Sequence, residues 1–160
     1  MANEKEFRQA KIAFATLCDM LDSHEWKYDR DDEQLVIKCG ANGDDLPIDI
    51  RIKVDPDRQL VSLYSHLPFS VPEEERVMAA VAVSAANLNM VDGNFDYNIA
   101  SGAILFRLTS SFRESLVSKD MFEYMLFVSC STVDNYNDKF LMLIKHAMTL
   151  EDFIKFSKEG

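Results

Sequence analysis

The sequence has few of the residues that mark common catalytic and metal sites. Its five glycines are scattered and form neither the G-x-G-x-x-G pattern nor the P-loop, both of which cradle phosphates. Its three histidines, His24, His66 and His146, are isolated, whereas metal ligation needs imidazole, thiolate or carboxylate groups at short spacing. No G-x-S-x-G stretch or comparable nucleophile signature is present. We therefore expect no enzyme activity, no cofactor and no metal ion.

Cysteines and long apolar runs are also scarce. The three cysteines, Cys18, Cys39 and Cys130, lie far apart in apolar patterns and form no C-x-x-C pair, which favours buried free thiols in a reducing cytoplasm. The longest uncharged run, residues 77–91, is too short to span a bilayer. The chain begins with charged residues where a signal peptide needs an apolar stretch. We expect a cytoplasmic protein that does not bind membranes.

Positive charge is in the minority. The 160 residues carry 17 Lys and Arg against 27 Asp and Glu, a formal net charge of −10. This excess repels phosphate backbones, so nucleic acids are not expected partners. The acids are spread along the chain, which indicates a distributed negative surface charge. Such a surface favours basic or amphipathic segments of a partner protein. Length and 48% hydrophobic content suffice for the core of one domain, residues 1–160.

Apolar periodicity predicts an α+β fold, an antiparallel β-sheet packed with helices in the order α-ββββ-α-ββ-α-α. The expected helices cover residues 4–22, 77–90, 118–148 and a short final segment from 149, and the expected strands lie near residues 26–29, 35–39, 48–54, 59–67, 95–99 and 104–108. Residues 70–75 (SVPEEE) indicate a helix start. Residues 149–152 resemble a capping box with Asp in the last position.

Two helical segments make specific predictions about burial. In the first helix, the i, i+3, i+7 spacing predicts one buried stripe, formed by Phe7, Ala10, Phe14, Leu17 and Leu21. The helix at residues 77–90 has alanines on several sides and almost no polar face. We expect it to pack closely on both sides.

An acidic stretch at residues 29–33 looks at first like a calcium-binding loop. Gln34 stands where that loop needs a glycine, and the closing glutamate is missing. We interpret the stretch as a solvated hairpin turn. Residues 55–57 (DPD) predict a second tight turn.

The strand at residues 48–54 alternates isoleucine and valine with charged residues. The pattern predicts a half-buried strand with one wet face, which carries Asp49, Arg51 and Lys53. A plain solvated sheet face is one interpretation of these residues. A surface that binds a partner is the other.

Arg107 stands in an otherwise apolar strand. It could be an anion hook, but an ion pair with a nearby acid is the favoured interpretation. An alternative function, an enzyme or small-ligand binder, would use a pocket around Arg107 with aromatics such as Tyr97 or Phe106.

The final helix places Leu150, Phe153 and Ile154 on one face and leaves Phe156 off it. This pattern motivates the hypothesis that the helix docks on a partner subunit or ligand protein. Packing on its own core is the favoured alternative.

Several short stretches resemble the YbjN-domain family by their order and spacing. They are residues 67–76 (LPFSVPEEER), 86–88 (ANL), 92–96 (DGNFD), 101–107 (SGAILFR) and 132–136 (TVDNY). The family is described as bacterial sensory transduction regulators and is structurally similar to type III secretion chaperones. The resemblance runs from about Phe7 to Phe156 and implies one YbjN-like domain with a chaperone-like fold.

The resemblance implies a non-enzymatic protein-binding or chaperone-like regulatory module, a homodimer in the bacterial cytoplasm. Dimers of this fold hold an unfolded client segment along exposed sheet and helix surfaces, where main-chain pairing supplies affinity. No catalytic residue is carried over. The partner-binding candidates are Asp49, Arg51, Lys53, Arg107, Phe153 and Phe156.

Overall fold

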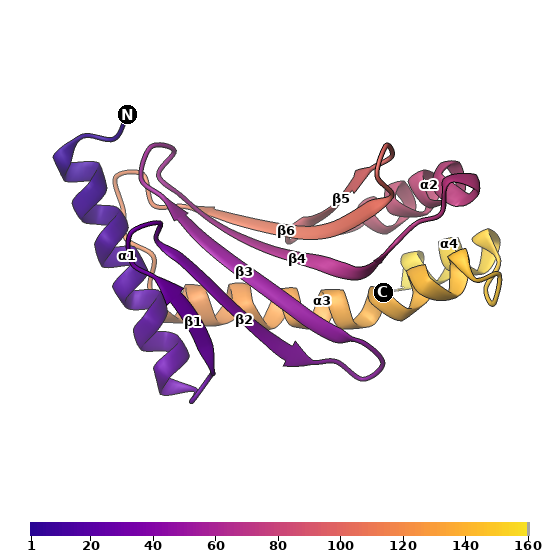
Figure 1. Cartoon of the computed structure of the whole chain (residues 1–160), viewed down its shortest axis with the longest axis horizontal. Coiled ribbons are helices and arrows are strands. Elements are labelled where there is room, and N and C mark those ends of the chain that lie inside the picture. The colour runs from indigo at the N-terminus through magenta and orange to yellow at the C-terminus, as the bar shows by residue number, and fades with distance from the viewer. Residues whose placement is uncertain (160) are drawn as a thin grey trace.

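The computed structural model describes residues 1–159, which form a six-stranded antiparallel sheet, four α-helices and one short 3-10 helix (Figure 1). The elements follow the predicted order. They are α1 (Glu4–Ser23), β1 (Tyr28–Asp31), β2 (Val36–Asn42), β3 (Pro47–Asp55), β4 (Leu60–Ser70), the 3-10 helix η1 (Glu73–Glu75), α2 (Arg76–Asn87), β5 (Asn94–Asn98), β6 (Ala103–Ser111), α3 (Lys119–Ile144) and α4 (Leu150–Glu159). None of these helices is both long and apolar enough to cross a membrane.

The sheet has the strand order β1-β2-β3-β4-β6-β5, with every neighbouring pair antiparallel. The first four strands form the predicted meander, and the second hairpin joins the sheet through its later strand. β6 contributes three buried side chains and β5 only one, which explains why β6 lies against β4 and β5 forms the edge. The sequence predicted the hairpin but not which strand would join the sheet.

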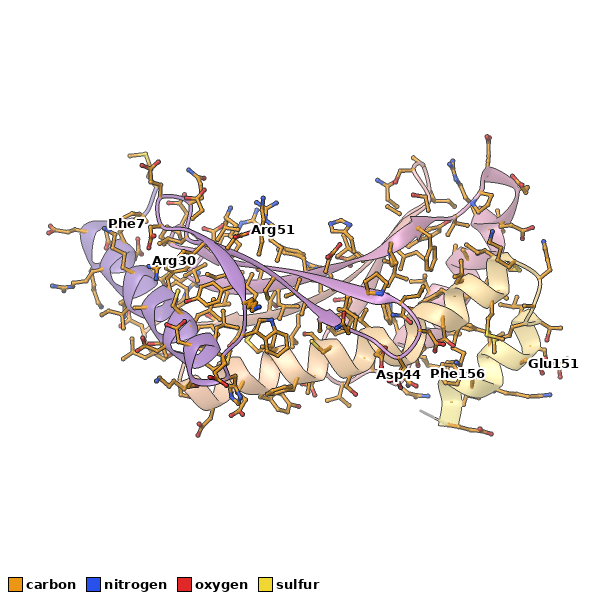
Figure 2. The ribbon with its side chains drawn as sticks, turned by 60° about the horizontal axis from the view of Figure 1, so that its bottom comes forward. Phe7, Arg30, Asp44, Arg51, Glu151 and Phe156 are labelled. Atoms are coloured by element: carbon orange, nitrogen blue, oxygen red, sulfur yellow. The ribbon has the colours of Figure 1, made fainter. Side chains whose placement is uncertain are left out.

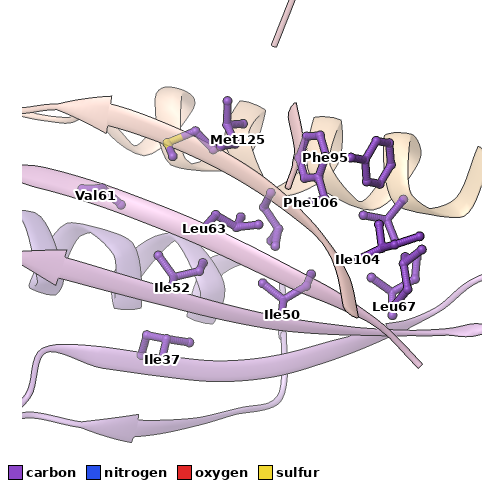
Figure 3. Packing of buried hydrophobic residues seen from close by; sticks show 14 of the residues in the cluster. Ile37, Ile50, Ile52, Val61, Leu63, Leu67, Phe95, Ile104, Phe106 and Met125 are labelled. Carbon is purple, nitrogen blue, oxygen red and sulfur yellow. The ribbon is translucent and has the colours of Figure 1, made fainter. Parts of the chain in front are cut away.

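The core lies between the sheet and the helices α1 and α3. In β3 the predicted alternation holds, with Ile48, Ile50, Ile52 and Val54 buried and the residues between them exposed. Figure 3 shows Ile50 and Ile52 beside Leu63 and Phe106 of neighbouring strands, with Met125 of α3 across from them. Fully burying one such side chain contributes about 1.5–3 kcal/mol to folding. The opposite face of the sheet is left open.

A capping box formed by Asn3 and Glu6 stabilises the N-terminus of α1. The Asn3 side chain accepts a hydrogen bond from the Glu6 N–H at 2.9 Å, and the Glu6 carboxylate accepts one from the Asn3 N–H at 2.7 Å. The predicted stripe is buried from Ala10 onward. For Phe7 the prediction is wrong, because its side chain is 41% exposed beside Lys11. The stripe therefore meets the core one turn later than expected.

Two contacts tie the α2 region to the second hairpin. The Val71 N–H donates to the Gly102 carbonyl at 2.9 Å, and a Cβ at Gly102, where φ is +77°, would lie 2.2 Å from the Val71 oxygen. Only glycine fits there. The Asn87 side chain accepts from the Phe95 N–H at 2.8 Å and donates to the Phe95 carbonyl at 2.9 Å. These residues belong to the stretches that carry the family resemblance, and here they hold the fold together.

The two C-terminal helices are separated by a short turn. α3 ends at Ile144, four residues before the predicted end near 148, and His146 adopts a left-handed conformation with φ 57°. The N-cap half of the predicted capping box is confirmed, because Thr149 Oγ1 accepts from the Asp152 N–H at 3.1 Å. The Asp152 carboxylate accepts from the Thr149 hydroxyl at 2.8 Å, whereas a capping box would have it accept from the Thr149 backbone N–H. The turn lets α4 fold back onto α2 and α3.

Candidate functional site

The open face of the sheet carries three of the predicted partner-binding residues. Asp49, Arg51 and Lys53 are exposed, and Figure 2 shows Arg51 pointing away from α3. Lys53 Nζ lies 3.9 Å from Asp55 Oδ2, whereas Arg51 has no carboxylate within 4.0 Å in the described part of the chain. The predicted wet face is confirmed, and the role of these residues in binding stays a prediction.

The strand registers align one row of outward side chains across all six strands. From β1 to β5 the row consists of Asp29, Lys38, Arg51, Tyr64, Arg107 and Asn94. Lys38 and Arg51 lie directly opposite each other on adjacent strands. Directly opposite side chains have Cβ atoms about 4.5–5.5 Å apart, so these two like charges repel each other.

Arg107 forms the ion pair that the sequence favoured. Its Nε lies 2.8 Å from Oδ2 of Asp96, and its Nη2 donates to Oδ1 of the same carboxylate at 3.1 Å. Both side chains are partly exposed, and exposed pairs contribute only about 0–1 kcal/mol to stability. The pair fixes the orientation of the guanidinium on the open face.

The structure does not bring Arg107, Tyr97 and Phe106 together in one pocket, so this part of the alternative hypothesis is wrong. Phe106 is fully buried in the core, because it alternates with Arg107 along β6 and points to the opposite face. The Tyr97 hydroxyl donates to the Arg76 carbonyl at 3.1 Å. Arg107 instead borders a shallow hollow of about 360 Å³ at residues 91–94 and 107–109.

α4 packs on its own chain, which was the favoured alternative. Phe153 is fully buried, with its ring centroid 4.9 Å from that of Phe140. Phe156, which the sequence left off the apolar face, is half-buried with its centroid 5.2 Å from that of Tyr136 (Figure 2). In this conformation Phe153 is unavailable to a partner, because the aromatic cluster of the chain itself covers it.

α2 differs most from the sequence prediction. It ends at Asn87, and only one of its sides is buried, against α4 and β5. On the other side Val77 is 72% exposed and Leu88 is 75% exposed. The prediction of close packing on both sides is therefore wrong within this chain, because α2 lies at the outer end of the sheet (Figure 1). The exposed side, called here the α2 outer face, borders a shallow hollow of about 490 Å³ and consists of Val77, Ala80, Val81, Ser84, Ala85 and Leu88.

α3 exposes a second apolar row, called here the α3 outer face. Met121, Tyr124 and Phe127 are 43–48% exposed and follow one another at three-residue spacing. The Phe127 ring meets the Trp26 ring edge-on, with centroids 6.2 Å apart. The Tyr124 hydroxyl donates to the Asp92 carboxylate at 2.5 Å. The sequence did not single out these residues, because one long helical pattern does not show which of its sides a sheet will cover.

A cleft of about 340 Å³ lies between the segment after α2 and the helices α3 and α4. Burial raises the pKa of Tyr136, which lines the cleft, so this phenol stays protonated. Half of the other residues that line the cleft are uncharged and polar, namely Asn89, Ser131, Thr132, Asn135 and Ser157, and the rest are apolar except Asp92. The stretch at 132–136, part of the family resemblance, supplies one wall.

The cysteines are protonated free thiols, and the acidic residues form no metal-binding group in residues 1–159. Burial raises the pKa of Cys39 to about 12 and that of Cys130 to about 11, so both are protonated at neutral pH, and all three cysteines are unbonded. No group of three or more His, Cys, Asp or Glu side chains could hold a metal ion there. The predicted turn is present but lies at residues 32–35, with Asp31 accepting from the Glu33 and Gln34 N–H groups, whereas Asp29 and Asp31 themselves belong to β1.

Residues 14–142 match a family model described as "YbjN: Putative bacterial sensory transduction regulator". The match leaves α4 and the first turns of α1 outside it. No curated protein matches the chain. Among solved structures, the crystal structure of YbjN from E. coli is similar to this chain at a TM-score of 0.56 and 13% identity, covering 76% of this chain and 85% of that one.

Two complexes contain a chain of the same fold. The HopA1-SchA chaperone-effector complex matches with a TM-score of 0.50 and 17% identity, over 78% of this chain and 91% of that one. The ExsC-ExsE complex matches with a TM-score of 0.53 and 11% identity, over 78% and 90%. At such identities the similarity concerns the fold, and it confirms the predicted type III secretion chaperone-like architecture.

Proposed function

The chain belongs to the YbjN family, and from this we propose that it is a non-enzymatic, chaperone-like regulatory module that binds a segment of another protein in the bacterial cytoplasm. The observation that carries the proposal is the uncovered apolar surface of a chaperone-like fold. The α2 and α3 outer faces leave large apolar side chains in water, and patches of this kind mark protein interaction sites. One structural relative is itself a chaperone-effector complex.

The α2 outer face suits a second copy of the chain. It has no charged residue among those that line it, and its alanines let another helix approach closely. In a two-fold dimer the same patch meets itself, so any charge near the axis would face its own copy. An uncharged apolar face is therefore self-complementary, and we assign the homodimer interface to it.

The α3 outer face suits the partner segment. Three-residue spacing of Met121, Tyr124 and Phe127 provides a continuous apolar track for an amphipathic helix. Acidic residues flank it, with Asp120 and Glu123 on α3 itself and Asp92 bonded to Tyr124. A partner segment with apolar residues and basic flanks complements this surface, as the net charge already suggested.

The dimer is tested by measuring mass in solution with light scattering. We expect a dimer for the wild type and a monomer for Val81→Asp, because the new carboxylate would face its copy across the two-fold axis. Val91→Asp is the matched control, since Val91 is 93% exposed outside the α2 outer face, and it should remain dimeric. A wild-type monomer at all concentrations would contradict this assignment.

Partner binding is tested by affinity capture from native cells, with stoichiometry read by native mass spectrometry. A stoichiometric partner should be retained by the wild type and lost by Phe127→Asp. Ile99→Asp, an equally drastic change at the exposed tip of the β5–β6 hairpin, should keep it. The proposal fails if no partner is captured, or if both variants lose it equally.

A second candidate function is the binding of a small polar molecule in the cleft beside Tyr136. The cleft volume of about 340 Å³ is at the lower end for small-molecule sites. Thermal stabilisation by a small molecule, abolished by Thr132→Leu, would favour this function over the first.

A further inference from the structure

We infer that the open face of the sheet binds an acidic segment of a partner protein, with Lys38 and Arg51 as its anchors. This inference shares one assumption with the proposed function, namely that the chain binds another protein. It concerns a surface separate from the two apolar helix faces, and a partner chemistry opposite to the one that the net charge of −10 favours.

The charges on this face are unevenly paired. Lys53 lies 3.9 Å from Asp55, and Arg107 lies 2.8 Å from Asp96. Lys38 and Arg51 have no carboxylate within 4.0 Å among residues 1–159, although Asp29 is opposite Lys38 in the strand register. Two cations are therefore available side by side on the face of an acidic protein.

This arrangement is unfavourable for the isolated fold. Lys38 and Arg51 are directly opposite each other on β2 and β3, where like charges destabilise a sheet. Asp29, opposite Lys38 on β1, offsets this only on the Lys38 side, because the other neighbour of Arg51 in the row is the uncharged Tyr64. The chain has 27 acids, yet none neutralises this pair within 4.0 Å in the described residues. An anion bound between the two side chains would remove the repulsion.

The surface around the pair is shaped to receive such a group. Lys38, Arg51 and Lys53 border a hollow of about 320 Å³ at the β1 end of the face. Arginine binds a carboxylate through two parallel hydrogen bonds, so Arg51 supplies orientation as well as charge. Tyr64, next in the row, is half-buried and offers an apolar ring beside the cations.

The rim of the hollow decides which anion fits. Asp29 and Asp31 line it, and Asp49 lies on the same face. These carboxylates, with the net charge, repel a long phosphate backbone. A short acidic segment can place one or two carboxylates between the cations and keep its uncharged residues near the rim, which favours a peptide over a nucleic acid.

The test uses fluorescence anisotropy with a labelled ten-residue peptide that has two adjacent glutamates at its centre and Ser and Thr elsewhere, at low salt. We expect saturable binding of the peptide to the full chain. The affinity should be about tenfold or more lower for the Arg51→Glu variant, and equally lower when glutamine replaces each glutamate of the peptide. Arg8→Glu on α1 makes the same charge change on an exposed residue of the other layer and should bind within about twofold of the wild type.

Arg51→Glu also separates binding from folding. It gives Lys38 an opposite charge across the strand pair, so its thermal midpoint should equal or exceed that of the wild type. Absence of peptide binding, or equal losses in Arg51→Glu and Arg8→Glu, overturns the inference. Tighter binding of a ten-nucleotide oligothymidine overturns it in favour of nucleic acid. Each result is independent of the dimer and capture experiments, which test the proposed function.

Discussion

α2 and α4 lie at the same end of the molecule, and they differ in how much of their apolar surface is buried. α4 has charged residues on one side and aromatics on the other, and the core buries Phe153 fully and Phe156 in part. α2 is apolar on nearly all sides, but only Ala79, Ala82, Val83 and Ala86 are buried in the core. A helix with one apolar side can bury that side within its own chain, whereas α2, apolar on nearly all sides, leaves one apolar side exposed there. This is the side to which we assign the dimer interface.

The largest effect should come from the aromatic cluster under α4. Phe153→Ala removes a fully buried ring that touches Phe140 and Tyr136, so the free energy of unfolding should fall by about 3–5 kcal/mol in urea titrations. Phe156→Ala, at the half-buried edge of the same cluster, should cost about 1–2 kcal/mol. Equal losses would mean that α4 does not bury one side as described.

A smaller effect should separate the two sides of α2. Ala82→Leu overpacks the buried side and should cost about 1–3 kcal/mol. Ser84→Leu adds similar bulk to the α2 outer face and should change stability by less than about 0.5 kcal/mol. Both are measured in a Val81→Asp background, so that self-association does not contribute. A similar cost for both would break the comparison between α2 and α4.

Solvent access sharpens the comparison without a change in stability. At pH 8, Ser84→Cys should react quickly with a maleimide in the Val81→Asp monomer and more slowly in the wild-type background, where the proposed dimer covers it. Ser157→Cys should react much more slowly than either, because Ser157 is 3% exposed, although it borders the cleft beside Tyr136. The native thiols give a low background, because burial raises the pKa of Cys39 to about 12 and of Cys130 to about 11. Raised values keep a thiol protonated until the pH approaches them, so the background should increase only well above pH 9. Rapid labelling of Ser157→Cys would contradict the docking of α4.

Local pattern determined most of the fold. The alternation of β3 and the Thr149 N-cap depend on neighbours in the sequence, and both were predicted correctly. The hairpin turn was predicted as well, but it lies at residues 32–35, and residues 29–31 belong to β1. The burial of Phe7 was predicted wrongly, because the point at which a helix extends beyond the core depends on the length of the sheet beneath it.

The candidate surfaces were harder to predict. Arg107 was expected to pair with an acid, but only the β5–β6 register identifies Asp96. The repulsive Lys38–Arg51 pair likewise needs the β2–β3 register. The α2 outer face was visible as an excess of apolar residues. The prediction that it would be buried failed because composition does not distinguish an apolar surface that the chain buries from one that it leaves exposed.

The two ends of the sheet limit how a partner can attach. β1 has four residues, and three of them, Asp29, Arg30 and Asp31, are charged. β5 has five, and Asn94, Asp96 and Asn98 alternate along it. Short, polar border strands are poor templates for strand addition and protect a protein from aggregating edge to edge. A guest chain that prolongs this sheet is therefore disfavoured at both borders, against the main-chain pairing that the family resemblance implied. The proposed partners would instead be held by side chains that project from the broad surfaces of the molecule.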